Sequence, residues 1–225
     1  MRTLSQCKLY AILDTGYCPP ERMGRMLEKM ITGGIDIVQL RAKGMASDRL
    51  AELVKDLHPL SRAASVPFII NDHPGLVAST GAEGAHIGVE DMSVVEARKL
   101  AGRKCLIGKS SHGIDQALDG AAQGADYLGF GPLFATATKP DYLPIGTAAI
   151  QEVYQRVAVP VFCIGGIKLG NLPMLRLQGA QRVVIVSGIL LAPDPSDYCQ
   201  QCIALMNQLS LPPAAPADPQ AAISG

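Results

Sequence analysis

The stretch PFIINDHPGLVASTGAEGAHIGVED, residues 67–91, contains one complete repeat of the pattern that decides the fold. A short apolar run over Phe68–Ile70 is followed by a helical pattern over Pro74–Thr80 and then by a second short run over Gly84–Ile87. Gly81 comes just after the helical pattern, where glycine readily takes the left-handed conformation that ends a helix. Strands and helices that alternate in this way are typical of βαβ units and a parallel sheet.

The same alternation continues along the chain. It predicts eight strands, over Leu9–Leu13, Ile35–Leu40, Phe68–Ile70, Gly84–Ile87, Cys105–Gly108, Tyr127–Phe130, Val161–Ile164 and Arg182–Val186. It predicts a helix after each strand, over Pro20–Ile31, Ser47–Ala64, Pro74–Thr80, Ser93–Ala101, Ile114–Gln123, Thr147–Arg156, Leu169–Gln178 and Pro195–Leu209. The alternative, an open doubly wound sheet, usually needs about five or six strands, and Gly129-Phe130-Gly131 lacks the third glycine of a dinucleotide fingerprint. We therefore expect an α/β fold with a single (β/α)8 TIM barrel.

Two regions of different composition predict the domain organisation. Residues 1–210 carry the strand and helix patterns and form the predicted barrel. Residues 211–225 carry prolines among alanines, so they cannot continue a helix and have little to bury. We expect a flexible Pro/Ala-rich tail there.

The overall composition argues against several classes of partner. Lysine and arginine together number 20, as do aspartate and glutamate, so the formal net charge is zero and nucleic acid is not expected. No apolar run approaches the roughly 18 residues that span a membrane. The segment Met1–Cys7 lacks the apolar core of a signal peptide. These features predict a soluble, cytoplasmic protein.

A CxxC motif at Cys199 and Cys202 raises the question of a zinc or redox site. A zinc site needs two more ligands with similar local spacing, and the sequence offers none. A thioredoxin-like motif would follow a strand, whereas this pair lies within the last predicted helix. We expect two structural thiols.

Cationic residues follow the predicted strands at equivalent places. In TIM barrels the chemistry sits at the C-terminal ends of the strands. Arg41 and Lys43 follow the second strand, and Lys139 lies in the long loop after the sixth. Any one of them alone would suggest a solvated surface residue. Together they predict an anion site, in which arginine can fork onto phosphate oxygens.

Two carboxylates, Asp72 and Asp91, leave neighbouring strands at the same level. Carboxylates beside a diphosphate are the usual ligands of Mg²⁺, which keeps several waters and shares phosphate oxygens. The alternative is that Asp72 caps a turn before Pro74 and that Asp91 caps the helix beginning near Ser93. We favour the magnesium site.

The seventh and eighth strands contribute no charge. Gly165-Gly166 lets a ligand approach the backbone closely, and Ser187, Thr136 and Thr138 add hydroxyls. A phosphate site between the loops after these strands recurs in this fold. The rim thus offers a charged half for a diphosphate and a neutral half for a monophosphate, which predicts two phosphorylated substrates.

Five stretches now point to one family: GGIDIVQLRAKG, FIINDHPGLVASTGAEGAHIGVEDM, GADYLGFGPLFATATKPDYLPIG, PVFCIGGI and VVIVSGI. They resemble thiamine-phosphate synthase and together cover nearly the whole chain up to the tail. The resemblance implies a transferase that joins 4-amino-5-hydroxymethyl-2-methylpyrimidine diphosphate to a thiazole phosphate, giving thiamine phosphate and diphosphate. It implies that diphosphate leaves first and that the thiazole nitrogen then attacks. The expected partners are therefore small molecules, and the sequence leaves open whether the chain forms a homo-oligomer.

The resemblance also assigns residues. The pyrimidine diphosphate would be bound by Gln39, Leu40, Arg41, Ala42, Lys43, Asn71, Ser110 and Lys139. The thiazole phosphate would be bound by Thr136, Ala137, Thr138, Gly166, Val186 and Ser187. Asp72 and Asp91 would hold Mg²⁺, and the catalytic cations would be Arg41, Lys43 and Lys139.

One residue, Lys109, departs from the family pattern. The family usually has a hydrophobic residue where Lys109 stands, so this lysine either adds a fourth cation or points into the wall between strand and helix. We interpret His86 as a strand residue and His112 as a support for its loop, because the attack of the thiazole nitrogen needs no strong base.

Two alternative functions are open. A thiazole tautomerase would lack the diphosphate residues, and a non-catalytic binder would lack Asp72 and Asp91. Because the sequence contains these residues, both alternatives are less favoured.

Overall fold

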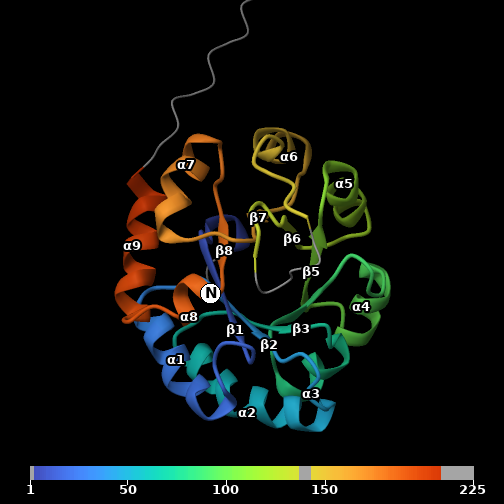
Figure 1. The fold of residues 1–225 in the computed structure, drawn as a ribbon. Helices are drawn as coiled ribbons and strands as arrows, with labels where there is room; N and C mark the ends of the chain where they lie inside the picture. The colour runs from blue at the N-terminus through green and yellow to red at the C-terminus, as the bar shows by residue number, and fades with distance from the viewer. Residues whose placement is uncertain (1–2, 137–142, 209–225) are drawn as a thin grey trace, which may run out of the picture.

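The computed structural model describes residues 3–136 and 143–208. Its eight parallel strands close into a barrel in the order β1-β2-β3-β4-β5-β6-β7-β8, ringed by helices (Figure 1). The strands are β1 (Leu9–Asp14), β2 (Ile37–Arg41), β3 (Phe68–Asn71), β4 (Gly84–Ile87), β5 (Leu106–Ser111), β6 (Tyr127–Phe130), β7 (Val161–Cys163) and β8 (Val183–Ile185). The predicted TIM barrel is confirmed. The predicted tail, 211–225, lies outside the described residues.

The helices follow the predicted pattern, with one addition. The α-helices are α1 (Pro20–Thr32), α2 (Ser47–Ala63), α3 (Val77–Thr80), α4 (Val94–Ala101), α5 (Ile114–Ala122), α6 (Ile150–Arg156), α7 (Leu172–Leu177), α8 (Ser187–Leu190) and α9 (Pro195–Gln208). Short 3-10 turns, η1 (Leu4–Gln6), η2 (Pro74–Leu76) and η3 (Leu169–Asn171), precede β1, α3 and α7. The additional helix is α8, which begins one residue after the end of β8 and which the sequence pattern does not predict. None of the helices within the described residues is long and apolar enough to cross a membrane.

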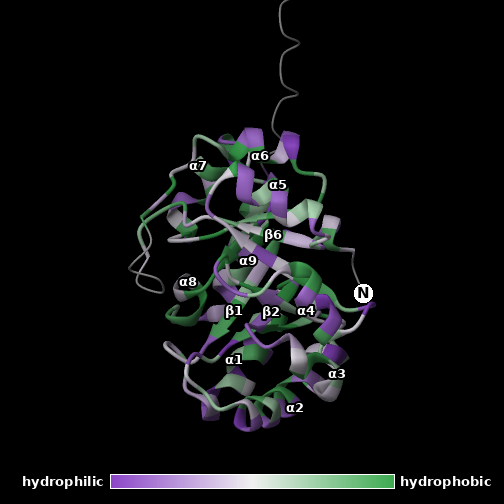
Figure 2. Cartoon of the chain, turned by 90° about the vertical axis from the view of Figure 1, so that its right-hand side faces the viewer, coloured by the Kyte–Doolittle hydropathy of each residue, from purple (hydrophilic) through white to green (hydrophobic). Residues whose placement is uncertain are grey.

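Period-two alternation along the strands separates two cores. On β1, Leu9, Ala11 and Leu13 face the helices, whereas Tyr10 and Ile12 face the barrel axis. The outer core lies between strands and helices, and the helices show hydrophilic residues mainly on their outward sides (Figure 2). Such layered filling makes the barrel interior a packed core rather than a pore.

The inner core is built around three aromatic rings. Tyr10, Tyr127 and Phe162 pack edge to face, with ring centroids 5.5–5.8 Å apart. Edge-to-face packing of this kind stabilises by about 0.5–1.5 kcal/mol per pair beyond the buried area. These rings close the barrel from inside and form the floor of the space above them.

The cysteines of the CxxC motif lie in the outer core. Cys199 and Cys202 on α9 are fully buried, and neither forms a disulfide. The Cβ of Cys199 lies so close to Gly33 that a Cβ at residue 33 would be only 2.6 Å from it. Burial raises the pKa of both thiols to about 12. This environment is that of packed, protonated side chains.

Candidate active site

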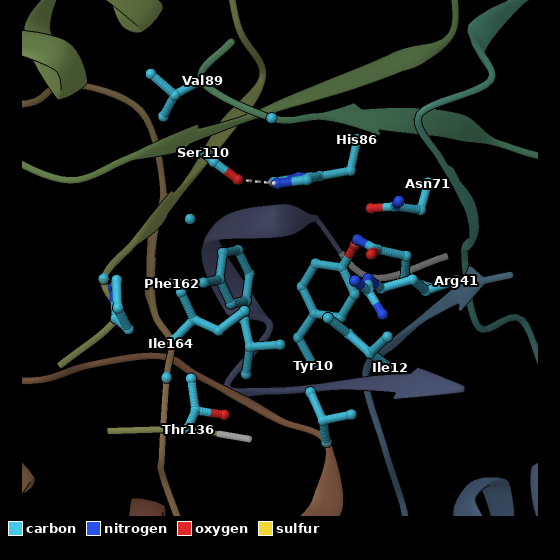
Figure 3. A pocket seen from close by; sticks show the side chains of 18 of the residues that line it. Tyr10, Ile12, Arg41, Asn71, His86, Val89, Ser110, Thr136, Phe162 and Ile164 are labelled. Atoms are coloured by element: carbon cyan, nitrogen blue, oxygen red, sulfur yellow. Dashed lines mark hydrogen bonds between the residues drawn. The ribbon is translucent and has the colours of Figure 1, made fainter. Parts of the chain in front are cut away.

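A pocket of about 410 Å³ opens at the C-terminal ends of the strands. All eight strands or the loops that follow them contribute to its lining. Figure 3 shows the aromatic floor with Arg41 and Asn71 on one side and Thr136 on the other. This is the face on which TIM barrels carry their chemistry.

A chain of hydrogen bonds crosses the floor of the pocket. Gln39 Nε2 donates to the hydroxyl of Tyr10 at 2.7 Å, and the hydroxyls of Tyr10 and Tyr127 lie 3.0 Å apart. His86 Nδ1 lies 3.3 Å from the Tyr127 hydroxyl, and His86 Nε2 lies 3.0 Å from Ser110 Oγ (Figure 3). Burial raises the pKa of both tyrosines, so the phenols stay protonated. The chain thereby links two residues predicted to bind the pyrimidine, Gln39 and Ser110.

The charged half of the pocket carries two ion pairs. Arg41 Nη1 lies 2.6 Å from Asp14 Oδ2, and Lys43 Nζ lies 2.9 Å from Asp72 Oδ2. The Lys43 side chain is 61% exposed, so this second pair contributes little to stability, about 0–1 kcal/mol. The mostly buried Arg41 is held in one orientation, whereas Lys43 remains free to turn toward a ligand.

Asp72 and Asp91 both line the pocket. Asp72 has a backbone φ of +62°, in the left-handed region that aspartate and asparagine tolerate better than most residues. Strained positions of this kind cluster at functional sites. The Asp91 carboxylate accepts a hydrogen bond from Gly88 N at 2.6 Å, so it closes the turn in which it lies.

The capping alternative for these two carboxylates is wrong. The N-cap of α4 is Ser93, which forms a capping box with Glu96, so Asp91 does not cap that helix. The turn at Pro74 begins at His73 and has no side-chain cap, and the Asp72 carboxylate pairs with Lys43 instead.

The donor set suits Mg²⁺ rather than zinc or a transition metal. Among the described residues no cluster of three or more His, Cys, Asp or Glu could hold a metal by itself. Two carboxylates are nevertheless sufficient for Mg²⁺ beside a phosphorylated ligand, because Mg²⁺ takes its remaining ligands from water and phosphate oxygens. Asp72 and Asp91 therefore fit the predicted role.

The neutral half lies at β7 and β8. Gly166 has a φ of +65°, and a Cβ there would lie 2.6 Å from Phe134 Cβ and 2.7 Å from the Ala135 carbonyl oxygen. Glycine is thus required at residue 166 for two reasons: the loop after β6 packs closely against it, and its backbone takes a positive φ. Ser187 is the first residue of α8 and lines the pocket.

The comparisons with known proteins agree with this geometry. A family model described as thiamine monophosphate synthase matches residues 9–189. The chain belongs to the thiamine monophosphate synthase family. Thiamine-phosphate synthases of Halalkalibacterium halodurans and Chloroflexus aurantiacus are each 37% identical to it over 89% of this chain, and the matches span 96% and 93% of those proteins.

Solved structures give the same result. The thiamine phosphate pyrophosphorylase of Pyrococcus furiosus superposes with a TM-score of 0.83 at 27% identity, covering 91% of this chain and 98% of that one. A 3-hexulose-6-phosphate synthase superposes with a TM-score of 0.64 at 17% identity, which shows a shared fold alone. The resemblance seen in the sequence is confirmed.

Most residues assigned from the thiamine monophosphate synthase family line this pocket. Its lining includes Gln39, Arg41, Lys43, Asn71, Asp72, Asp91, Ser110, Thr136, Gly166, Val186 and Ser187. Three further assignments, Ala137, Thr138 and Lys139, lie outside the described residues. Leu40 does not line this pocket, because its side chain is buried in the outer core against the helices. Ala42 does not line it either, but it lines a second pocket that shares Lys43, Asn71 and Asp72 with the first.

Sequence reasoning assigned no role to several pocket residues. Tyr10, Tyr127 and Phe162 line the floor. His86 lies on β4, which confirms its interpretation as a strand residue, but it lines the pocket as well. The usable signal was the two-residue alternation, which places one side of every barrel strand inward. His112 supports its loop as predicted, because its Nδ1 contacts the carbonyl oxygen of Gly131.

Proposed function

We propose that this protein condenses 4-amino-5-hydroxymethyl-2-methylpyrimidine diphosphate with a thiazole phosphate, giving thiamine phosphate and diphosphate. Support comes from the likeness to curated thiamine-phosphate synthases over most of the chain. The observation that carries the proposal is that one pocket has a charged half and a neutral half. Arg41, Lys43 and the two carboxylates line one half, and Gly166 with Ser187 lines the other.

The charged half would bind the diphosphate. Arg41 is already oriented by Asp14, so its side chain loses little further conformational freedom when it contacts phosphate oxygens. Lys43 would add a point charge, and Lys139 is proposed to add another. Asp72 and Asp91 would hold Mg²⁺, which when bound neutralises charge on the departing diphosphate.

The reaction exchanges one bond for another. The bond between the pyrimidine methylene carbon and the diphosphate oxygen breaks, and a bond from that carbon to the thiazole nitrogen forms. The ring nitrogen attacks with its lone pair, so no proton has to be removed. The protein's main contribution is then preorganised charge at the leaving group, a type of group whose removal costs about 2–4 kcal/mol of transition-state stabilisation.

The neutral half would orient the nucleophile. Backbone N–H groups near Gly166 and the hydroxyls of Ser187 and Thr136 suit a monophosphate that needs direction more than charge. The ring floor of Tyr10, Tyr127 and Phe162 keeps water out from below.

The test is an assay of diphosphate release by the purified chain with Mg²⁺. We expect release that depends on the thiazole phosphate, and thiamine phosphate as the product by mass spectrometry. Isomerisation of a thiazole phosphate without use of the pyrimidine would favour a tautomerase. Binding of either compound without any product would favour a non-catalytic binder, and both of these outcomes reject the proposal.

A further inference from the structure

Lys109 departs from the family pattern, and the structure shows where its side chain goes. It lies on β5, its residue is only 9% exposed, and it is absent from the pocket lining. Of the two interpretations open at the sequence level, the side chain points into the wall between strand and helix rather than adding a fourth cation.

The ammonium group ends against the loop between β4 and α4. Lys109 Nζ donates to the carbonyl oxygens of Gly88 at 2.6 Å, Met92 at 3.2 Å and Val89 at 3.3 Å. An ammonium group has three N–H donors, so the three carbonyls match its full capacity. We call residues 88–92 the Asp91 loop.

The fold leaves a slot for the lysine stem. Gly120 on α5 is buried, and a Cβ there would lie 3.5 Å from Lys109 Cγ and 3.0 Å from Leu128 Cδ2. Burial lowers the pKa of Lys109, and the charges of Asp91 and Asp119 act in the opposite direction. A charged group in such a slot is costly unless its donors are satisfied.

Asp91 and Lys109 hold the same residue from two sides. The Asp91 carboxylate accepts from Gly88 N at 2.6 Å, and Lys109 Nζ donates to Gly88 O at 2.6 Å. The direction of the Asp91 carboxylate therefore depends on a turn that Lys109 fixes from behind.

We propose that Lys109 is a positioning residue, which holds the Asp91 loop in the shape that presents the Asp91 carboxylate to the magnesium site. The proposal rests on the proposed function, because the magnesium site does. Groups that orient metal ligands typically change metal affinity by about 10–100-fold when they are removed.

The test compares Lys109→Met with Arg98→Met as a matched control. Methionine keeps an unbranched stem and removes all three donors. Arg98 also donates to backbone carbonyls, of Cys105 at 2.9 Å and Gly124 at 2.7 Å. These carbonyls precede β5 and β6, at the end of the barrel opposite to the pocket. Both variants should lose thermal stability, so stability alone does not separate the two roles.

Two other measurements separate them. In Lys109→Met we expect the Mg²⁺ concentration for half-maximal activity to rise at least about tenfold, with little change in KM for the thiazole phosphate. Amide hydrogen exchange, read without any metal, should accelerate within residues 88–92. Arg98→Met should change neither quantity. In Lys109→Arg the Mg²⁺ concentration for half-maximal activity should lie between the values of the wild type and of Lys109→Met.

The outcomes against the proposal are distinct from those against the proposed function. An active wild type with unchanged magnesium dependence in Lys109→Met overturns the role of Lys109 alone. A wild type that makes no thiamine phosphate overturns the proposed function. Should Lys109→Met not fold, Lys109→Gln is measured in the same way, and an unchanged half-saturating concentration there overturns the proposal.

Discussion

Asp14 and Arg41 are register partners at the ends of β1 and β2, and their side chains meet at 2.6 Å with Asp14 only 2% exposed. Asp14 also accepts a hydrogen bond from the backbone N–H of Gly16 at 2.8 Å, so a second contact fixes the orientation of its carboxylate. The guanidinium at the pocket rim is thus anchored by a buried group on the neighbouring strand.

Asp14→Ala should raise KM for the pyrimidine diphosphate, because Arg41 must then be ordered during binding. The expected cost is about 0.5–1.5 kcal/mol, the usual cost of immobilising one such side chain. Steady-state kinetics measure it, with Glu52→Ala as the control, since Glu52 pairs with Arg49 on the surface. An unchanged or lowered KM in Asp14→Ala contradicts the anchoring role.

Asp72→Asn and Asp91→Asn should each remove most activity and weaken the dependence on Mg²⁺. Both variants should stay folded, because asparagine tolerates the positive φ at position 72 and can still accept from Gly88 N at position 91. Activity against Mg²⁺ concentration and a thermal melt measure the two effects. Turnover like that of the wild type in both variants would sink the magnesium assignment.

Ser187→Ala should raise KM for the thiazole phosphate by the equivalent of about 0.5–1.5 kcal/mol, as for one hydrogen bond. The unphosphorylated thiazole alcohol serves as the control substrate and should be insensitive to the change. Equal effects on both substrates would show that Ser187 shapes the start of α8. Gly166→Val is a poor test of the same site, because the new side chain would displace Phe134.

Cys199 and Cys202 should react slowly with alkylating reagents in the folded protein, because their thiols are buried and protonated. Folding raises each pKa from its ordinary value of 9.0 to about 12, so the folded state holds these protons more tightly. The resulting stability is fully present below pH 9 and is lost as pH rises toward 12. Chemical unfolding from pH 9 to 12 measures the effect in the wild type and in a Cys199→Ala/Cys202→Ala variant. If the free energy of unfolding falls with pH equally in both proteins, the prediction is contradicted. That variant should keep its activity.

The sequence was sufficient for the barrel because the short apolar runs and the glycines after helices repeat. It did not reveal α8, since four residues after a strand carry no helical period. It ended β5 at Gly108, whereas the strand runs to Ser111. Because neighbouring residues on a strand face opposite sides, this extension sends Lys109 outward and Ser110 into the pocket.

Placement on the rim was predictable where charge and position coincided, as at Arg41 and Asp72. The role of Asp14 was not, because it depends on which residue of the next strand lies beside it. Leu40 was assigned with its neighbours Gln39 and Arg41, although alternate residues of β2 face away from the pocket. A motif transferred as a continuous block ignores this alternation.

The hydrogen-bonded floor makes the two sides of the pocket depend on each other. Gln39 Nε2 donates to the Tyr10 oxygen, and the contacts of Tyr10 with Tyr127, of Tyr127 with His86 and of His86 with Ser110 continue the chain across the pocket. Each hydroxyl has a single hydrogen, so a ligand that reorients the Ser110 hydroxyl changes what the His86 ring can donate or accept. The ¹⁵N chemical shifts of the His86 ring, recorded with and without the pyrimidine diphosphate, measure this change.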